Sequence, residues 1–401
     1  MPVKIISKSK GHFQTLTNKI QPEAYSGTAF INALKFSDVQ VEYVTEDELH
    51  HDRSYIFLIE PQWTEEEQRT GYENIFKGAI REIPQSIKQK IKEYNIKVII
   101  STINEPWGLE PANVVSPNLK DCIREGVSQS KCLILVGNHK VNDIESKGIK
   151  KIVKVINYWP FHYYSPDWLN ELNTKKINLK KHFVCLNRTI KTHRTALLFH
   201  LYNHQLLDNG YVSFYSEVNG LDYFKHKNNF EPTYNYPTKN LKQIDKLLPL
   251  RIEEEVINPN EDNPTYFGAV KRIEKVFRSS FMNVVTETWT SNDLLFLSEK
   301  IYKPIFLKQP FLVVGNPYTI KYLRDNGFDV FDDIFDHSYD EELNENKRLE
   351  MVVGEIKKIC DKPLEHLDEL LISIGGRLEK NRKHFFSVYM NKQKNLLRNL
   401  I

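Results

Sequence analysis

Short apolar runs alternate with longer amphipathic stretches along the first part of the chain. The runs are rich in Val and Ile, which is typical of strands buried in a sheet. They predict strands at 3–6, 39–44, 55–59, 97–101, 132–136 and 152–156. Helical patterns lie between them, at 64–82 and 84–94, and the first opens with three glutamates that suit a helix N-terminus. Strands that alternate with helices predict a parallel sheet.

The same rhythm returns in the second half. The pattern predicts strands at 182–186, 211–215, 282–286 and 311–314. It predicts helices at 192–209, 298–308 and 318–326, of which the first ends at Asn209-Gly210 and the last at Gly327. A polar stretch, 219–263, separates the two groups, and the chain from 341 onward is almost wholly helical with a break at Gly375-Gly376. We therefore expect an α/β fold of two Rossmann-like lobes, joined near 165–181, with a C-terminal helical tail.

Composition agrees with this architecture. The chain has 401 residues, of which 40% are hydrophobic and 27% charged, so we expect a soluble globular protein with room for two cores. Its 55 basic and 52 acidic residues nearly balance, which argues against a polybasic tail but allows a local basic patch. No apolar run approaches the roughly 20 residues of a membrane span. The four cysteines form no CxxC pair, and we expect free thiols in a cytoplasmic protein, of bacterial or phage-infected host origin.

Several familiar motifs are missing. The sequence has no GxG, Walker or GxSxG pattern and no pair of aspartates spaced as DxD. We therefore expect neither a metal site nor a bound cofactor.

One basic run, 175–194, contains seven Lys or Arg residues and no acid. Its centre is a strand that ends at Asn187-Arg188 and turns into a helix near Thr192. Arg188 and Arg194 flank that turn, where guanidinium forks and a helix N-terminus could hold a diphosphate. The lysines at 175–181 are better explained as a solvated linker.

A second signal is the triplet Ser298-Glu299-Lys300, which follows a strand and opens a helix. Ser298 is a plausible N-cap. Glu299 could accept both hydroxyls of a ribose, and Lys300 could neutralise phosphate. The alternative for Glu299 is that an acid is simply favourable at a helix start.

This region resembles a known family. Glu287 at a strand end, the Ser298-Glu299-Lys300 triplet and the string 310–315 look like the donor-binding lobe of α-1,3-fucosyltransferase-type and exostosin-like glycosyltransferases. With Leu186-Asn187-Arg188 and the strings 323–331 and 336–340, the series is similar to a group of bacterial and phage glycosyltransferases. At 286–289 the chain reads Thr-Glu-Thr-Trp, where the fucosyltransferases have a Phe-Glu-Asn-Ser-like string.

The resemblance implies a GT-B arrangement, a UDP- or GDP-sugar as co-substrate, and no required metal. It implies that Glu299 binds the ribose, that Lys300 and Arg188 bind the phosphates, and that Glu287 lies near the sugar or ribose. Residues 1–175 would form the acceptor lobe and 176–370 the donor lobe, and a C-terminal helix, 371–401, would cross back onto the first lobe. Without a divalent cation, Arg, Lys and a helix N-terminus must stabilise the leaving diphosphate.

An inverting transfer also needs a base for the acceptor hydroxyl. Glu60 and Glu105 each follow a predicted strand and precede a proline and an aromatic residue, so we expect one of them in this role, with His162 behind them. Trp63 and Trp107 could stack on an acceptor, although most tryptophans are core residues. The acceptor could be a glycan, a lipid-linked sugar or a modified DNA base such as 5-hydroxymethylcytosine. A non-catalytic nucleotide- or nucleic-acid-binding protein is the alternative class.

Overall fold

A computed structural model gives the fold of the chain. It describes residues 2–6, 12–14, 20–22, 34, 39–59, 83, 85–102, 124–128, 131–136, 152–154, 174–175, 177–187, 191–214, 217–218, 221–222, 234–235, 241–252 and 266–399. Contacts divide the chain into two units, Met1–His162 with Lys392–Ile401, and Tyr163–Asn391. The lobe boundaries expected from the sequence, at 175/176 and 370/371, stay predictions.

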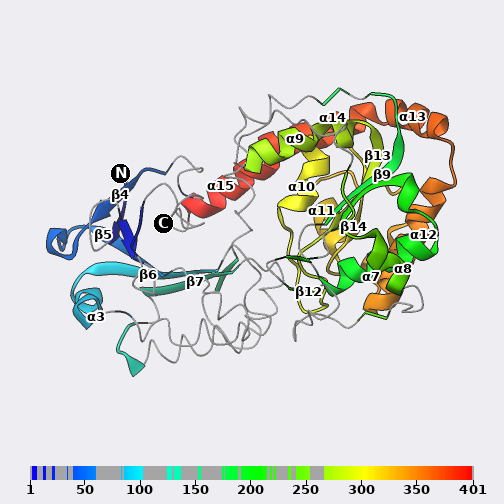
Figure 1. Ribbon diagram of the computed structural model, residues 1–401. Coiled ribbons are helices and arrows are strands. Elements are labelled where there is room, and N and C mark those ends of the chain that lie inside the picture. The colour runs from blue at the N-terminus through cyan, green and yellow to red at the C-terminus, as the bar shows by residue number, and fades with distance from the viewer. Residues whose placement is uncertain are drawn as a thin grey trace. The chain divides into compact units, whose positions relative to one another are not determined.

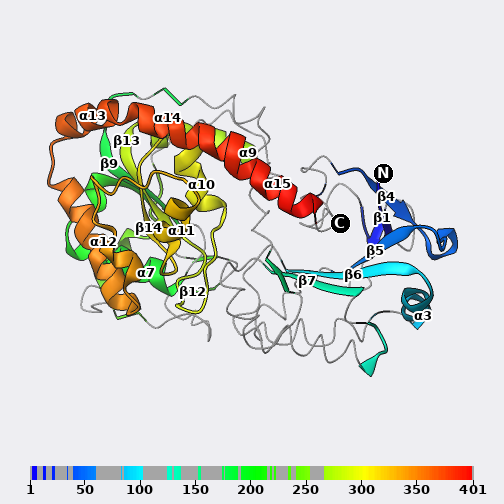
Figure 2. The same cartoon turned by 180° about the vertical axis from the view of Figure 1, so that it is seen from behind.

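The first unit contains a parallel sheet of six strands (Figure 2). Its order is β4 (Val41–Val44), β1 (Val3–Ile6), β5 (Ser54–Ile59), β6 (Asn95–Thr102), β7 (Cys132–Val136) and β8 (Ile152–Lys154). Helix α3 (Gln85–Glu93) leads into β6 and packs on it, and its buried Ile87 and Ile91 provide the contact face. The unit also includes the 3-10 turn η1 (Glu46–Glu48) and a hairpin of β2 (His12–Gln14) and β3 (Ile20–Pro22).

The second unit contains a parallel sheet of four strands (Figure 1). Its order is β10 (Gly210–Phe214), β9 (Lys181–Asn187), β13 (Ser280–Thr286) and β14 (Phe311–Val314). Every residue of β13 and β14 is buried, as expected for strands covered on both faces. A small antiparallel pair, β11 (Glu217–Val218) and β12 (Leu221–Asp222), lies outside this sheet.

Several helices follow β9 along the chain. They are α7 (Thr192–Asn203), α8 (Leu241–Leu247), α9 (Tyr266–Arg278), α10 (Glu299–Phe306), α11 (Thr319–Asp325), α12 (Glu345–Cys360), α13 (Leu364–Ser373), α14 (Gly375–His384) and α15 (Met390–Arg398). The 3-10 turns are η4 (Leu207–Asn209) and η7 (His337–Glu341), and a π-helical turn, Phe385–Tyr389, joins α14 to α15. Helices α9 and α10 pack on β13, α12 packs on α7 and β14, and α13 packs on β9 and β13.

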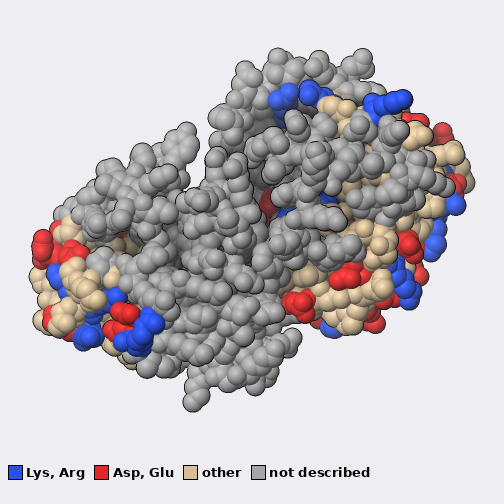
Figure 3. Space-filling model, turned by 60° about the horizontal axis from the view of Figure 1, so that its bottom comes forward, with Lys and Arg blue, Asp and Glu red and all other residues tan. Residues whose placement is uncertain are grey.

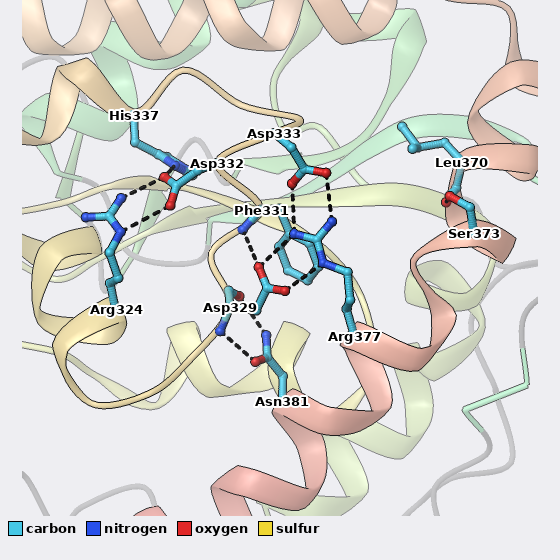
Figure 4. Close-up of polar contacts among 10 residues, drawn as sticks. All are labelled: Arg324, Asp329, Phe331, Asp332, Asp333, His337, Leu370, Ser373, Arg377 and Asn381. Carbon is cyan, nitrogen blue, oxygen red and sulfur yellow. Dashed lines mark hydrogen bonds and ion pairs between the residues drawn. The ribbon is translucent and has the colours of Figure 1, made fainter.

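Arg377 anchors the tail helix α14 to the loop that precedes η7 (Figure 4). Its guanidinium bonds both carboxylate oxygens of Asp329, at 2.6 and 2.9 Å, and both of Asp333, at 2.8 Å. It also stacks on the ring of Phe331, and Asn381 bonds the backbone of Asp329. The hydrogen bonds from Arg377 hold the pKa of Asp329 below its usual value. These contacts hold α14 to this loop, and α14 also packs on α10.

The described surface carries both signs of charge. In the view of Figure 3, acidic and basic side chains lie intermixed over the described parts of both units. The described surface includes exposed ion pairs such as Arg324–Asp332 and Lys321–Asp325. In the described part of the chain, no helix has the length and apolar character needed to cross a bilayer.

The predicted α/β fold with two parallel sheets and a helical tail is confirmed. The strands expected at 3–6, 132–136 and 311–314 are observed with these bounds. The break expected at Gly375-Gly376 coincides with the start of α14, directly after α13 ends. The helix expected at 192–209 ends at Asn203, because Gln205 takes a left-handed conformation (φ 58°) and a separate turn, η4, follows. Helix α9 was not predicted. The helix expected at 64–82 lies outside the described residues.

Candidate functional site

The candidate site is built at the carboxyl edge of the second sheet. Strands β9 and β13 end there side by side, and the hydroxyl of Thr286 donates to Asn187 Oδ1 at 2.6 Å. The chain leaves β13 at Glu287, whose backbone N–H donates to Val314 O of β14 at 2.9 Å. Three neighbouring strand ends therefore position Glu287.

Glu287 is fully buried. Its carboxylate accepts hydrogen bonds from the Ser298 backbone N–H, at 3.2 Å to each oxygen, and from the Ser298 hydroxyl. Burial raises the pKa of Glu287, while Lys300 and Ser298 oppose that shift. A β-carbon at Gly315 would lie 3.1 Å from Val313 Cγ1 and 3.4 Å from Glu287 Cβ and Cγ, so the chain packs closely beside Glu287. Glu287 thus joins the end of β13 to the start of α10.

Helix α10 begins as the sequence predicts. Ser298 is its N-cap, and its hydroxyl accepts from the Lys300 backbone N–H at 3.3 Å. The helix runs over Glu299–Phe306, slightly shorter than expected, because Lys308 has a left-handed backbone (φ 57°). Glu299 and Lys300 therefore lie in the first turn, beside the carboxyl end of β13.

The Lys300 ammonium has three oxygen partners. They are Glu299 Oε1 at 3.0 Å, Ser298 Oγ at 3.1 Å and Thr288 Oγ1 at 3.2 Å. The Glu299 and Lys300 side chains are 14% and 25% exposed, so both charges are accessible from solvent yet partly desolvated. Burial opposes ionisation of Glu299, but Lys300 and Lys303 outweigh it and lower its pKa to about 2. Glu299 is therefore an ionised acceptor at neutral pH.

This shift predicts a pH dependence of stability. Because the pKa of Glu299 is depressed in the folded state, its stabilisation is present above the unfolded pKa and is lost as pH falls towards about 2. Between about pH 5 and about pH 3, the wild type should lose about 2 kcal/mol more unfolding free energy than Glu299→Gln. Urea unfolding of both proteins across this range measures the difference. Parallel curves for the two proteins would contradict this interpretation.

Arg194 lies in α7 and is 3% exposed. Its guanidinium donates to the backbone carbonyls of Thr286 and Glu287, both at 3.2 Å. His193 Nε2 lies 2.9 Å from the same Glu287 carbonyl, and since a carbonyl only accepts, Nε2 carries the proton. Arg194 thus supports the backbone at Glu287. Its expected contact with a diphosphate stays a prediction.

The other expected site residues fall outside the described parts of the chain. These are the second phosphate ligand Arg188, the candidate bases Glu60, Glu105 and His162, and the candidate acceptor residues Trp63 and Trp107. Their roles stay predictions. Within the described residues, no group of three or more His, Cys, Asp or Glu side chains could hold a metal ion.

The structure adds residues that the sequence reasoning missed. Thr288 is a partner of Lys300, and Lys303 lies one helical turn beyond Glu299. Burial lowers the pKa of Lys303 to about 8, against the opposing effect of Glu299. The spacing of Glu299 and Lys303, four residues apart at a helix start, was a usable signal. Lys191 lies over the Trp289 ring, 4.5 Å from its centroid, and so connects the loops that follow β9 and β13.

No protein-family model and no curated protein matches the sequence. Among solved structures, the chain is similar to two structures of T4 phage BGT. Each match covers 99% of this chain and 99% of the BGT chain. A mutant bound to UDP-glucose is 10% identical, and a complex with UDP and Mn2+ is 12% identical; each has a TM-score of 0.40. An alpha1,3-fucosyltransferase with GDP is 8% identical over 94% of this chain and 90% of that one, with a TM-score of 0.36.

Proposed function

We propose that this protein is a glycosyltransferase that takes its sugar from a nucleotide-diphosphate donor, held at the carboxyl edge of the second sheet. One observation carries the proposal. The first turn of α10 presents an ionised carboxylate, Glu299, and an ammonium, Lys300, next to each other where β13 ends. Ligands of open α/β sheets bind at this edge.

The two groups suit the two ends of a ribose diphosphate. Glu299 has only acceptor oxygens when ionised, so it can take hydrogen bonds from ribose hydroxyls. Lys300 supplies a positive charge for the phosphates, and the N-terminus of α10 adds its partial charge. When the sugar is transferred, negative charge develops on the leaving diphosphate, and a fixed cation there lowers the barrier. We propose that these groups do this without a divalent metal.

Glu287 has a supporting role in this proposal. Its carboxylate holds both the backbone and the hydroxyl of Ser298, and Ser298 in turn holds Lys300. The position of the Lys300 ammonium is therefore set by a series of hydrogen bonds that starts at Glu287, at the end of β13. We propose that the acceptor is deprotonated by Glu60 or Glu105, which would give an inverting transfer.

A thermal-shift screen tests the donor. UDP-, GDP-, ADP- and CMP-sugars are added to the full chain in the presence of EDTA, and one class should raise the unfolding midpoint. A ligand at about 100 times its Kd stabilises a protein by about 2.7 kcal/mol. If none of these compounds shifts the midpoint, with or without Mg2+ or Mn2+, the proposal is wrong; a shift that requires the metal would overturn only the metal-free part.

The acceptor is tested by transfer from the donor so identified. A panel of glycans, lipid-linked sugars and hydroxymethylated DNA duplex is offered at about 50 and about 200 mM salt. A DNA acceptor should give rates that fall steeply with salt, because several phosphates would be contacted. Binding of the donor with neither transfer to any acceptor nor hydrolysis of the donor would instead indicate a non-catalytic nucleotide-binding protein.

A further inference from the structure

The Lys300 ammonium is saturated before any ligand arrives. It has three N–H donors and, among the residues that the structure describes, three oxygen partners, from Thr288, Ser298 and Glu299. Contact with a phosphate therefore requires that Lys300 give up at least one of them. Glu299 is the only charged partner of the three, and it is also the group that a ribose would engage.

Separation of Glu299 from Lys300 removes the neighbouring positive charge that stabilises the ionised carboxylate. Its side chain is only 14% exposed, and burial disfavours its ionised form. A partly buried carboxylate that loses its cation either takes up a proton or moves towards water. Either change would spoil Glu299 as an acceptor for ribose hydroxyls at the moment when Lys300 engages the diphosphate.

A second cation, Lys303, follows Glu299 on the same helix. It lies four residues after Glu299 on α10, and a glutamate that precedes a lysine by four residues is the favourable order on a helix. Its charge contributes, with that of Lys300, to holding Glu299 ionised. In the described part of the chain, the other charged groups that act on it are Lys300 on the same helix, Glu287 at the end of β13 and Arg194 on α7.

We propose that Lys303 is a positioning residue of the donor site, which holds the Glu299 carboxylate in place while Lys300 turns to the diphosphate. This inference rests on the proposed function. Lys303 does not contact the donor and acts through Glu299. Lys303 should therefore contribute nothing to donor binding in a variant in which residue 299 carries no charge, such as Glu299→Gln.

A double-mutant cycle tests this directly. UDP and GDP are titrated by calorimetry into the wild type, Lys303→Met, Glu299→Gln and the double variant. Lys303→Met should weaken binding about tenfold in the wild-type background and less than about twofold in the Glu299→Gln background. Lys303→Arg should restore binding. Lys308→Met is the matched control, because Lys308 has its own carboxylate partner, Glu379, at 3.1 Å, and it should bind as the wild type does.

A pH profile gives a second readout. Since the pKa of Lys303 is lowered to about 8, wild-type affinity should fall as pH rises through about 8, whereas Lys303→Arg should keep its affinity there. Equal effects of Lys303→Met in the two backgrounds, or wild-type affinity in Lys303→Met, would overturn the inference. If Lys303→Met fails to fold, the Lys303→Arg profile decides, and an unshifted profile overturns the inference. A wild type that binds neither UDP, GDP, ADP nor CMP refutes the proposed function itself.

Discussion

Lys300→Ala should bind the sugar-nucleotide donor at least about thirtyfold more weakly than the wild type. The variant removes the ammonium that is proposed to face the diphosphate, and loss of one partner from a partly desolvated charge pair costs about 2–5 kcal/mol. Calorimetric titration with the donor from the thermal-shift screen measures the change. The transfer rate at saturating donor should fall as well, because the same charge stabilises the leaving diphosphate.

Lys308→Ala is the control for this variant. Lys308 follows the same helix but pairs with Glu379 on α14, so its loss should leave donor affinity within about twofold. Lys300→Ala also removes a hydrogen-bond donor from Ser298 and Thr288, and its unfolding midpoint should be recorded beside that of the control. If a folded Lys300→Ala protein binds every sugar nucleotide as tightly as the wild type, the site has been assigned to the wrong residues.

Local chemistry explains why much of this site could be predicted from the sequence. Ser298 was expected to cap a helix, because a serine before an apolar periodic run provides the missing acceptor for the first turn. The structure confirms that cap and places Glu299 and Lys300 in the first turn. The strand of residues 311–314 was equally clear, since a short apolar run between turn residues has few alternatives.

The same local signals did not give the direction of each side chain. Arg194 was expected at the turn where β9 leads into α7, and it does lie in the first turn of α7. Its guanidinium, however, bonds the backbone at the end of β13, a segment far along the sequence. Which face of α7 meets β13 depends on the packing of the whole sheet. It cannot be predicted from the spacing of residues within 175–194.

Helix α9 was missed for a different reason. Residues 266–278 directly follow the polar stretch 219–263, although Val270, Ile273 and Phe277 recur at helical spacing. Lys303 lies outside the Ser298-Glu299-Lys300 triplet and was not predicted as a site residue. Its importance depends on burial near Glu299 and Glu287, which is a tertiary property.

Arg194→Met should lower the free energy of unfolding by about 2–4 kcal/mol. The substitution keeps much of the side-chain volume but leaves the buried carbonyls of Thr286 and Glu287 without their guanidinium donor. A buried group that loses a charged hydrogen-bond partner costs about 1–3 kcal/mol, and two carbonyls are affected, one of which keeps His193. Chemical denaturation of the wild type and the variant measures the loss.

Arg324→Met provides the matched comparison for Arg194→Met. Arg324 also makes two hydrogen bonds, to Asp332, but that pair is 46% and 55% exposed, so its loss should cost no more than about 1 kcal/mol. The pair of variants also separates two roles for Arg194. A guanidinium that supports the backbone at Glu287 gives a large loss of stability, and it weakens donor binding only through the position of Ser298 and Lys300. A guanidinium that contacts the diphosphate would give the reverse: near wild-type stability and a loss of affinity comparable to that of Lys300→Ala.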